Sequence, residues 1–214
     1  MATVRQLIHE NSEKGWEKAW DMNVTPWDVL GSVQPPLRSL LLGTEQDWPR
    51  NGRALVPGCG RGYDPIFIAT TLNLNTVAVD ISPTAIQAAK ELLTKTPGIP
   101  VGKVIFQETD FFSFSVPENE RFILIYDYTF FVAIPPVKRS DWGRQMNSLI
   151  KPGGYLIALV YPLTATDDGP PFSVQPEHYH EALGDGWTTV IARTPEDSIS
   201  SHIGREYLIV WQKE

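Results

Sequence analysis

The sequence has little of the chemistry that marks secreted, metal-bound or membrane-spanning proteins. Among 214 residues there is one cysteine and there are four histidines, so an internal disulfide is impossible and a cysteine-based zinc site is excluded. The longest strongly apolar run, at 155–161, is far shorter than the roughly 18 residues of a membrane-spanning helix. The first ten residues contain no apolar stretch of signal-peptide length. We expect a cytoplasmic protein that holds no metal.

Basic residues are also scarce. The 18 lysines and arginines are outnumbered by 25 aspartates and glutamates, which gives a net charge of −7. This balance disfavours nucleic acid or an anionic membrane as a partner. The apolar fraction of 42% and the charged fraction of 20% are typical of a folded chain. Because no repeat or linker is visible, we expect one domain over residues 1–214, a monomer whose partner is a small molecule.

Strand and helix patterns alternate along most of the chain. Apolar and β-branched runs predict strands at 53–56, 76–80, 103–107, 122–125, 155–160, 187–192 and 206–211. Helical spacing predicts helices that begin near 64, 82, 140 and 177. Such alternation is typical of a three-layer α/β fold with a mostly parallel sheet. The last two strands have no helix between them, so we expect them to form an antiparallel edge pair.

A glycine-rich loop follows the first expected strand and precedes the first expected helix. It reads Val-Pro-Gly-Cys-Gly-Arg-Gly at 56–62, and glycines in this place let the backbone approach a ligand closely. Asp80 lies 22 residues after Gly58, at the end of the second strand, where an acid usually accepts hydrogen bonds from ribose hydroxyls. The pattern predicts an adenosine-containing ligand. The alternative is a structural turn with a helix-capping aspartate.

The glycine spacing narrows the choice of ligand. A dinucleotide fingerprint needs a glycine at 63, where the chain has Tyr63, and the sequence contains no G-x-x-x-x-G-K-[ST] phosphate loop. The spacing G-x-G-x-G resembles motif I of the class I S-adenosylmethionine-dependent methyltransferases, whose ligand has no phosphate. That motif usually has an acid two residues before its first glycine, and this chain has Val56 there.

The third and fourth strands end in residues that suit the same ligand. Asp110 and Phe111 follow the third strand, where class I methyltransferases hold adenine. The fourth strand runs into Asp127 and Tyr128. Ligands of open α/β sheets lie outside the carboxyl ends of the strands, so these groups are expected at one mouth. For Asp110 and Phe111 the alternative is a capped turn followed by core phenylalanines.

Several longer segments together resemble one protein family. They are Gly-Trp-Glu-Lys-Ala-Trp at 15–20, Thr-Pro-Trp-Asp at 25–28, Leu-Val-Pro-Gly-Cys-Gly at 55–60, Val-Asp-Ile-Ser at 79–82, Asp-Phe-Phe at 110–112, Ala-Ile-Pro at 133–135 and Leu-Val-Tyr-Pro-Leu at 159–163. The chain resembles the thiopurine S-methyltransferase superfamily, in particular its plant and fungal thiol, halide and thiocyanate branch. The resemblance implies a Rossmann-like class I fold with seven strands and an N-terminal helical lid over residues 1–45.

The resemblance also implies a cofactor, S-adenosylmethionine, with S-adenosylhomocysteine as its product. The residues that it assigns to cofactor binding are Trp16, Trp20, Trp27, Gly58, Gly60, Asp80, Ile81, Asp110, Phe111 and Tyr128. The residues that it assigns to the acceptor pocket are Phe131, Val132 and Tyr161, flanked by the Gly-Pro-Pro-Phe loop at 169–172. Members of the plant branch tend to have cysteine where this chain has Val132, so a more apolar pocket is expected.

Tryptophan is abundant, and three of the seven tryptophans lie within the first 27 residues. Trp16 and Trp20 are four residues apart and would share one face of a helix. They could simply dock that helix onto the core. Together with the motifs above, we expect them to form an aromatic cover over a sulfonium, because aromatic faces attract a methyl-bearing cation.

Other reactive side chains favour structural roles. His178 and His180 have no cysteine nearby and are expected on the surface rather than on a metal. The pair Asp167-Asp168 precedes Gly-Pro and is typical of a turn. Cys59 lies in the glycine loop without an apparent base, so we interpret it as a small residue that fits the turn rather than as a nucleophile.

The expected reaction moves a methyl group from S-adenosylmethionine to a small soft nucleophile, such as a thiol, bisulfide, thiocyanate or halide, by in-line displacement in a dry pocket. We expect Tyr161 and Asp127 to assist. Two alternatives stay open: a methyltransferase of a bulkier aromatic thiol or other acceptor, and a dinucleotide-binding oxidoreductase or non-catalytic binding module.

Overall fold

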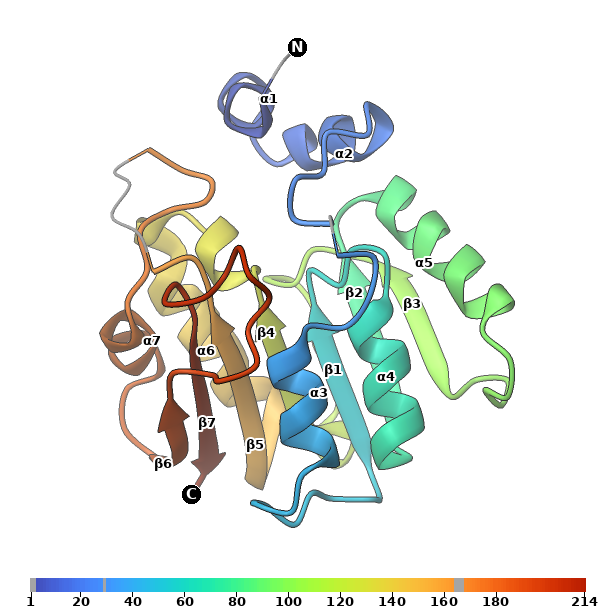
Figure 1. The fold of residues 1–214 in the computed structure, drawn as a ribbon, viewed down its shortest axis with the longest axis vertical. Helices are drawn as coiled ribbons and strands as arrows, with labels where there is room; N and C mark the ends of the chain where they lie inside the picture. The colour runs from blue at the N-terminus through green and yellow to red at the C-terminus, as the bar shows by residue number, and fades with distance from the viewer. Residues whose placement is uncertain (1–2, 29, 164–167) are drawn as a thin grey trace.

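The computed structural model describes residues 3–28, 30–163 and 168–214, and it is built on one seven-stranded sheet (Figure 1). The strand order is β3-β2-β1-β4-β5-β7-β6. The strands are β1 (Arg53–Pro57), β2 (Asn75–Asp80), β3 (Val104–Glu108), β4 (Phe122–Tyr128), β5 (Ile150–Val160), β6 (Trp187–Arg193) and β7 (Tyr207–Lys213). β1 to β5 are parallel, and β7 pairs antiparallel with both β5 and β6. The expected mostly parallel sheet with an antiparallel edge pair is confirmed.

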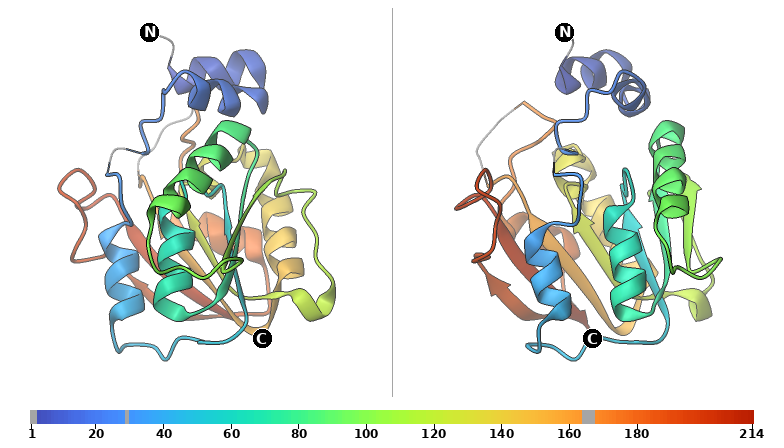
Figure 2. Two further views of the ribbon diagram at one scale, coloured as in Figure 1. Left: turned by 90° about the vertical axis from the view of Figure 1, so that its right-hand side faces the viewer. Right: turned by 45° about the vertical axis from the view of Figure 1, so that its right-hand side comes forward.

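Helices cover both faces of the sheet, so the fold has three layers (Figures 1 and 2). On one face lie α3 (Pro35–Leu42), α4 (Tyr63–Leu72) and α5 (Pro83–Lys95), and on the other lie α6 (Arg139–Leu149) and α7 (Pro176–Leu183). Short 3₁₀ turns are η1 (Glu118–Glu120), η2 (Phe131–Ala133) and η3 (Pro136–Lys138). Two buried apolar clusters fill the spaces between the layers.

Side chains alternate along each strand, so neighbouring residues of one strand belong to different clusters. In β2, Val77 and Val79 pack towards α6 and α7, whereas Ala78 packs towards α3 and α4. This is the period of two that a strand imposes on its side chains. Because apolar residues occupy both sets of positions, the central strands are buried on both faces, as parallel strands between helices require.

Most predicted boundaries agree with the structure to within a few residues. The helix at 82–96 begins as expected, because the hydroxyl of Ser82 accepts a hydrogen bond from the amide of Ala85 and caps α5. The helix expected to begin near 140 ends at Leu149. β5 begins at once with Ile150 and continues through the Pro-Gly-Gly segment, beside an irregular register between Phe122 and Leu124 in β4.

The helices α1 (Val4–Asn11) and α2 (Lys14–Asp21) lie above the carboxyl ends of the parallel strands (Figures 1 and 2). They pack closely because Gly15 has no side chain: a Cβ there would lie 2.5 Å from the carbonyl oxygen of Leu7. α3 also falls within residues 1–45, where we expect a lid, but it belongs to the core layer, where Leu37 and Leu41 are fully buried.

Within the described residues, no helix is both long and apolar enough to cross a bilayer.

Candidate active site

A cavity of about 750 Å³ lies between the N-terminal helices and the carboxyl ends of the strands. It is lined by the glycine loop and by the ends of β2, β4 and β5, with α2 above it. Every residue assigned to the cofactor by sequence lines this cavity, as do Val132 and Tyr161. The chain therefore brings together, at one mouth of the sheet, groups that are separated by up to 145 residues (161 − 16) in the sequence.

The glycine loop needs its glycines for backbone conformation and for space. Gly58, Gly60 and Gly62 all have positive φ, at 57°, 50° and 85°, a region that residues with a Cβ rarely adopt. A Cβ on Gly58 would lie 2.5 Å from the ring of Phe130, and one on Gly62 would lie 2.7 Å from another ring. The glycines therefore let the loop turn sharply and pack against these rings, and Gly58 and Gly60 line the cavity with backbone alone.

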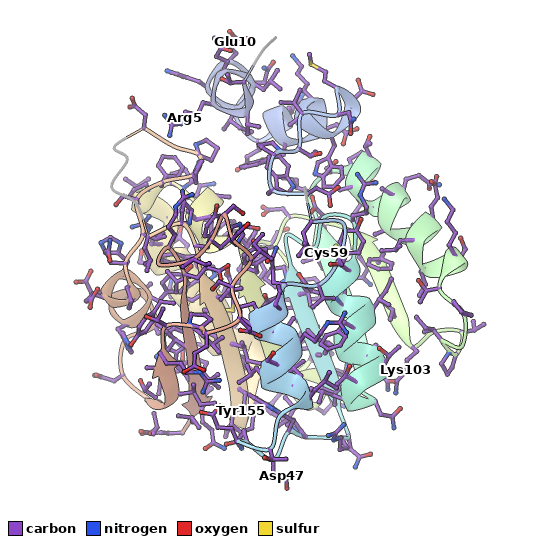
Figure 3. All side chains as sticks on the ribbon, viewed as in Figure 1. Arg5, Glu10, Asp47, Cys59, Lys103 and Tyr155 are labelled. Carbon is purple, nitrogen blue, oxygen red and sulfur yellow. The ribbon has the colours of Figure 1, made fainter. Side chains whose placement is uncertain are left out.

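Cys59 lies at the centre of this loop, just above the tip of β1 (Figure 3). Its backbone amide donates to the carbonyl of Val79 at 3.0 Å, which joins the loop to β2. Burial raises the pKa of the Cys59 thiol well above its ordinary value, and the charge of Asp80 adds to this rise. A thiol held neutral is a poor nucleophile, so the geometry agrees with a residue that fits the turn.

Asp80 fastens the glycine loop to the end of β2. Its Oδ2 accepts a hydrogen bond from the amide of Gly60 at 2.9 Å, and its Oδ1 accepts one from the amide of Ser82 at 3.0 Å. Burial raises the pKa of Asp80, and these hydrogen bonds oppose the rise. Each carboxylate oxygen accepts more than one hydrogen bond, so Asp80 keeps acceptor capacity on the cavity side.

The turn after β3 combines the two roles that the sequence left open. Oδ1 of Asp110 accepts from the amide of Phe112 at 2.9 Å, which caps the turn. Phe111 is 3% exposed and packs edge-on against Phe130 with ring centroids 5.1 Å apart. Asp110 and Phe111 nevertheless both line the cavity, so the capped turn also forms part of the cavity wall.

The three early tryptophans form one aromatic cluster over the cavity. The ring of Trp27 lies 5.7 Å from that of Trp16 and 6.2 Å from that of Trp20, in both cases edge to face. Trp20 is 7% exposed, whereas Trp16 is half-buried. Arg61 stacks over Trp20 at 5.4 Å and donates through its Nε to Asp28 at 2.5 Å. The cluster thus packs against the glycine loop and also faces the cavity.

A carboxylate that sequence reasoning missed joins α2 to the body of the protein. Oε1 of Glu17 accepts from the hydroxyl of Thr84 at 2.6 Å, and Oε2 accepts from the hydroxyl of Ser82 at 2.5 Å and from the amide of Thr84 at 3.2 Å. Partial burial pushes the pKa of Glu17 upward, but these hydrogen bonds outweigh burial and lower it. The carboxylate lies at the N-terminus of α5, where negative charge is favourable.

The opposite end of the cavity is lined by Tyr128, Val132, Tyr161, Phe172 and Arg205. The rings of Tyr128 and Tyr161 lie 6.5 Å apart, and the guanidinium of Arg205 lies 5.4 Å from the Tyr161 ring. The amide of Phe172 donates to the carbonyl of Val132 at 2.8 Å, so the 169–172 loop is attached to η2. Asp167 lies outside the described residues, so the structure leaves the Asp167-Asp168 prediction untested.

Behind Tyr161 lies a buried polar group that the sequence did not single out. His202 stacks on the Tyr161 ring with centroids 3.8 Å apart, and its Nδ1 lies 2.6 Å from Oε1 of Glu206. The hydroxyl of Ser198 donates to Oε2 of Glu206 at 2.6 Å. Ser198, His202 and Glu206 all lie in the connection between β6 and β7. Their spacing in the sequence carries no motif, so only the fold reveals that they support Tyr161.

Two assigned residues do not line the cavity. Asp127 is fully buried and accepts hydrogen bonds from the amide of Phe131 at 3.1 Å and from the indole of Trp142 at 2.9 Å. Phe131 is also fully buried, with its ring 4.0 Å from that of Tyr179. Alternation along β4 turns Tyr128 to the cavity and Asp127 to α6. The expectation that Asp127 assists the reaction and that Phe131 lines the pocket is therefore corrected.

The two histidines of α7 have structural partners. Nδ1 of His178 accepts from the amide of Gln175 at 3.2 Å and lies 3.1 Å from a guanidinium nitrogen of Arg139. Nδ1 of His180 accepts from the indole of Trp211 at 3.2 Å. Both side chains remain partly or fully exposed, and the described residues contain no cluster of three or more metal-ligating side chains.

Comparison with known proteins identifies the family. The model of the thiopurine S-methyltransferase family matches residues 11–212. The chain belongs to the thiopurine S-methyltransferase family. It is 38% identical over 209 residues to the probable thiol methyltransferase 2 of Arabidopsis thaliana, covering 97% of this chain and 88% of that protein. It is 38% identical over 212 residues to thiocyanate methyltransferase 1 of Brassica oleracea, covering 98% of this chain and 90% of that protein.

The fold of this family member recurs in more distant solved structures. A TehB-like S-adenosylmethionine-dependent methyltransferase from Corynebacterium glutamicum superposes with a TM-score of 0.66 at 14% identity, over 92% of this chain and 99% of that chain. The chain is thus a small-molecule methyltransferase with the class I fold.

Proposed function

We propose that this protein binds S-adenosylmethionine in the cavity and transfers its methyl group to a small soft anion, such as a thiolate or bisulfide, thiocyanate or a halide. The observation that carries the proposal is the composition of the cavity's far end. There, the guanidinium of Arg205 lies 5.4 Å from the Tyr161 ring, and Tyr128, Val132 and Phe172 also line the cavity. An apolar wall with one cation suits an anion that must lose its water before it attacks.

The cavity fits the cofactor on observations of its own. The glycine loop lines the cavity with the bare backbone of Gly58 and Gly60, and Asp80 retains acceptor capacity for two ribose hydroxyls. Asp110 and Phe111 are available to an adenine, and the tryptophan cluster is available to a sulfonium. When bound, S-adenosylmethionine supplies an electrophilic methyl group on a positively charged sulfur.

The protein's own residues then orient and dehydrate the acceptor. Tyr161 is held from behind by His202, so its ring is a fixed wall rather than a mobile side chain. Arg205 attracts the anion towards this wall. Anion and sulfonium neutralise each other as they react, so exclusion of water accelerates the step. Soft anions are already ionised at neutral pH, which makes a general base unnecessary, and Asp127 lies outside the cavity in any case.

The relatives support this choice of acceptor. The plant proteins that share 38% identity with this chain are named for thiol and for thiocyanate methylation. Both similarities extend over nearly the whole chain, including the segments that line the far end of the cavity.

The test is a panel of acceptors incubated with S-adenosylmethionine, with volatile methyl products measured by headspace gas chromatography. We expect methyl thiocyanate, methanethiol or methyl iodide from thiocyanate, bisulfide or iodide, and none from the Asp80→Ala variant. Aromatic thiols form the second arm of the panel. Turnover of aromatic thiols alone would overturn the small-anion proposal in favour of the bulkier acceptor.

A further inference from the structure

Asp64 presents a carboxylate to the cavity without a partner. It lies in the first turn of α4, two residues after Gly62, and it lines the cavity. Among the described residues, its side chain makes no hydrogen bond or ion pair. Burial alone raises its pKa to about 7. A carboxylate desolvated in this way, with no group in the protein to satisfy it, indicates that a positively charged or hydrogen-bond-donating ligand belongs beside it.

Gln34 provides an independent sign of the same kind. It precedes α3, lines the same cavity and is only 4% exposed, yet its Oε1 has no hydrogen-bond partner in the described structure. Buried amide oxygens are normally satisfied. Oε1 of Gln34 can therefore accept a hydrogen bond from an N–H or O–H donor of a bound ligand.

Gln34 and Asp64 both act on Tyr128, which lines the same cavity. Burial contributes most to the raised pKa of Tyr128, the charges of Glu206 and Asp64 add to it, and a hydrogen bond with the side chain of Gln34 opposes it. Gln34 immediately precedes α3 and Asp64 lies in the first turn of α4, and these two helices pack side by side on one face of the sheet (Figure 1).

The chemistry of this place matches a primary ammonium. An ammonium has one positive charge and three N–H donors, which suit a carboxylate and an orphaned amide oxygen together. A sulfonium has no N–H to offer Gln34. The other cations that line the cavity are engaged: Arg61 with Asp28, Lys138 with Glu13, and Arg205 over Tyr161.

We propose that Asp64 and Gln34 bind the ammonium group of the amino-acid end of the cofactor. This inference rests on the proposed binding of S-adenosylmethionine. It also accounts for Val56, which occupies the place where the glycine motif usually has an acid. In this chain the required carboxylate is supplied eight residues later, from the first turn of α4.

The experiment compares three ligands by isothermal titration calorimetry. S-adenosylhomocysteine carries the ammonium and the carboxylate, decarboxylated S-adenosylhomocysteine carries only the ammonium, and 5′-deoxy-5′-methylthioadenosine carries neither. We expect Asp64→Asn and Gln34→Leu to weaken binding of the first two at least tenfold and at least threefold, respectively, with binding of the third changed less than twofold. Asp80→Ala is the matched control, because it should weaken all three ligands alike.

A double variant tests whether a carboxylate at this place is what binds the ammonium. Asp64→Asn combined with Gln34→Glu moves the carboxylate to the neighbouring position, so it should recover most of the preference for the two ammonium-bearing ligands. Retained binding of methylthioadenosine shows in each variant that the cavity is folded. Equal weakening of all three ligands in Asp64→Asn, or no weakening of any, overturns the ammonium site and leaves the proposed function standing. If the unmodified protein binds none of the three, both proposals fail.

Discussion

Thr84 donates two hydrogen bonds to one residue, Glu17, one from its hydroxyl and one from its backbone amide. Glu17 belongs to α2 above the sheet, and Thr84 belongs to the first turn of α5 in the body of the fold. The pair is one of the points at which the helices that cover the cavity are fastened to the body of the fold, together with the ion pair between Lys138 and Glu13.

We predict that Glu17→Gln loosens this cover. The substitution removes the charge that the α5 N-terminus favours and replaces one acceptor oxygen with a donor, which costs about 1–2 kcal/mol. Amide exchange in α1 and α2 should accelerate at least threefold, and S-adenosylhomocysteine should bind more weakly. Glu10→Gln, on the exposed side of α1, is the control and should change neither. Unchanged exchange in α2 would mean that other contacts, such as the tryptophans and the Lys138–Glu13 ion pair, hold the cover without Glu17.

Trp16 and Trp20 differ in how far their side chains are buried. Trp16 is half-buried and Trp20 is 7% exposed, so Trp16→Ala should weaken ligand binding with little loss of stability, whereas Trp20→Ala should reduce both. Because the rings attract a cation, binding of S-adenosylmethionine should fall by about 0.5–2 kcal/mol more than that of the neutral S-adenosylhomocysteine. Trp48→Phe, in the core beside Tyr155, should lower stability only. Equal losses for the two ligands would assign the rings to packing.

Asp64 should make the ligand-free protein less stable as the pH rises. Its pKa is about 7 in the folded protein against an ordinary value of 3.8, so between these values the folded state keeps a proton that the unfolded state has lost. The free energy of unfolding therefore falls as pH rises through this interval. The groups that face it, Cys59, Tyr126 and Tyr128, stay neutral there because burial raises their own pKa values.

Asp64→Asn removes this dependence. We expect its Tm at pH 8 to exceed that of the unmodified protein by at least about 3 °C, since 1 kcal/mol corresponds to about 2–4 °C for a domain of this size. At pH 4 the difference should vanish. Thermal denaturation at both pH values checks this, with the exposed Asp185→Asn as control. A gain that is equal at both pH values would contradict the assignment of the slope to Asp64.

Asp127 should matter for folding rather than for the reaction. Alanine in its place leaves the amide of Phe131 and the indole of Trp142 without an acceptor in the core, which should cost about 2–4 kcal/mol of stability. Asp127→Asn keeps the shape, and its kcat with thiocyanate should stay within threefold of the unmodified value. A hundredfold loss of kcat in a variant with unchanged Tm would restore Asp127 as a participant in the reaction.

Arg205 should set the affinity for anionic acceptors. Arg205→Gln removes the cation beside Tyr161, so the KM for thiocyanate should rise about tenfold with kcat little changed, and added salt should reduce the difference. Arg193→Gln, which disrupts a surface ion pair with Glu45, is the matched control. Steady-state kinetics at two ionic strengths check this. A fall in kcat without a change in KM would place Arg205 in transition-state stabilisation instead.

The sequence predicted those parts of the fold and site whose signals are local. Strands such as 155–160 are continuous apolar runs, and the glycine loop carries its own spacing, so both were found correctly. Glu17, Gln34 and His202 were missed because each acts on a residue far along the chain and none has a motif around it. Asp127 was assigned to the reaction because it precedes Tyr128 in the sequence. Side chains alternate along β4, however, so the two residues lie on opposite faces of the sheet.

The connection between β6 and β7 contributes residues to the proposed acceptor end of the cavity but none to the proposed cofactor site. It brings His202 and Arg205 to Tyr161, whereas the proposed cofactor residues come from α2 and the segment after it, the glycine loop, the starts of α3 and α4, and the ends of β2, β3 and β4. Under the proposed function, exchange of this one connection would change part of the acceptor end of the cavity and leave the cofactor residues in place. Transplanting residues 198–206 between relatives is thus a compact route to enzymes with new acceptors.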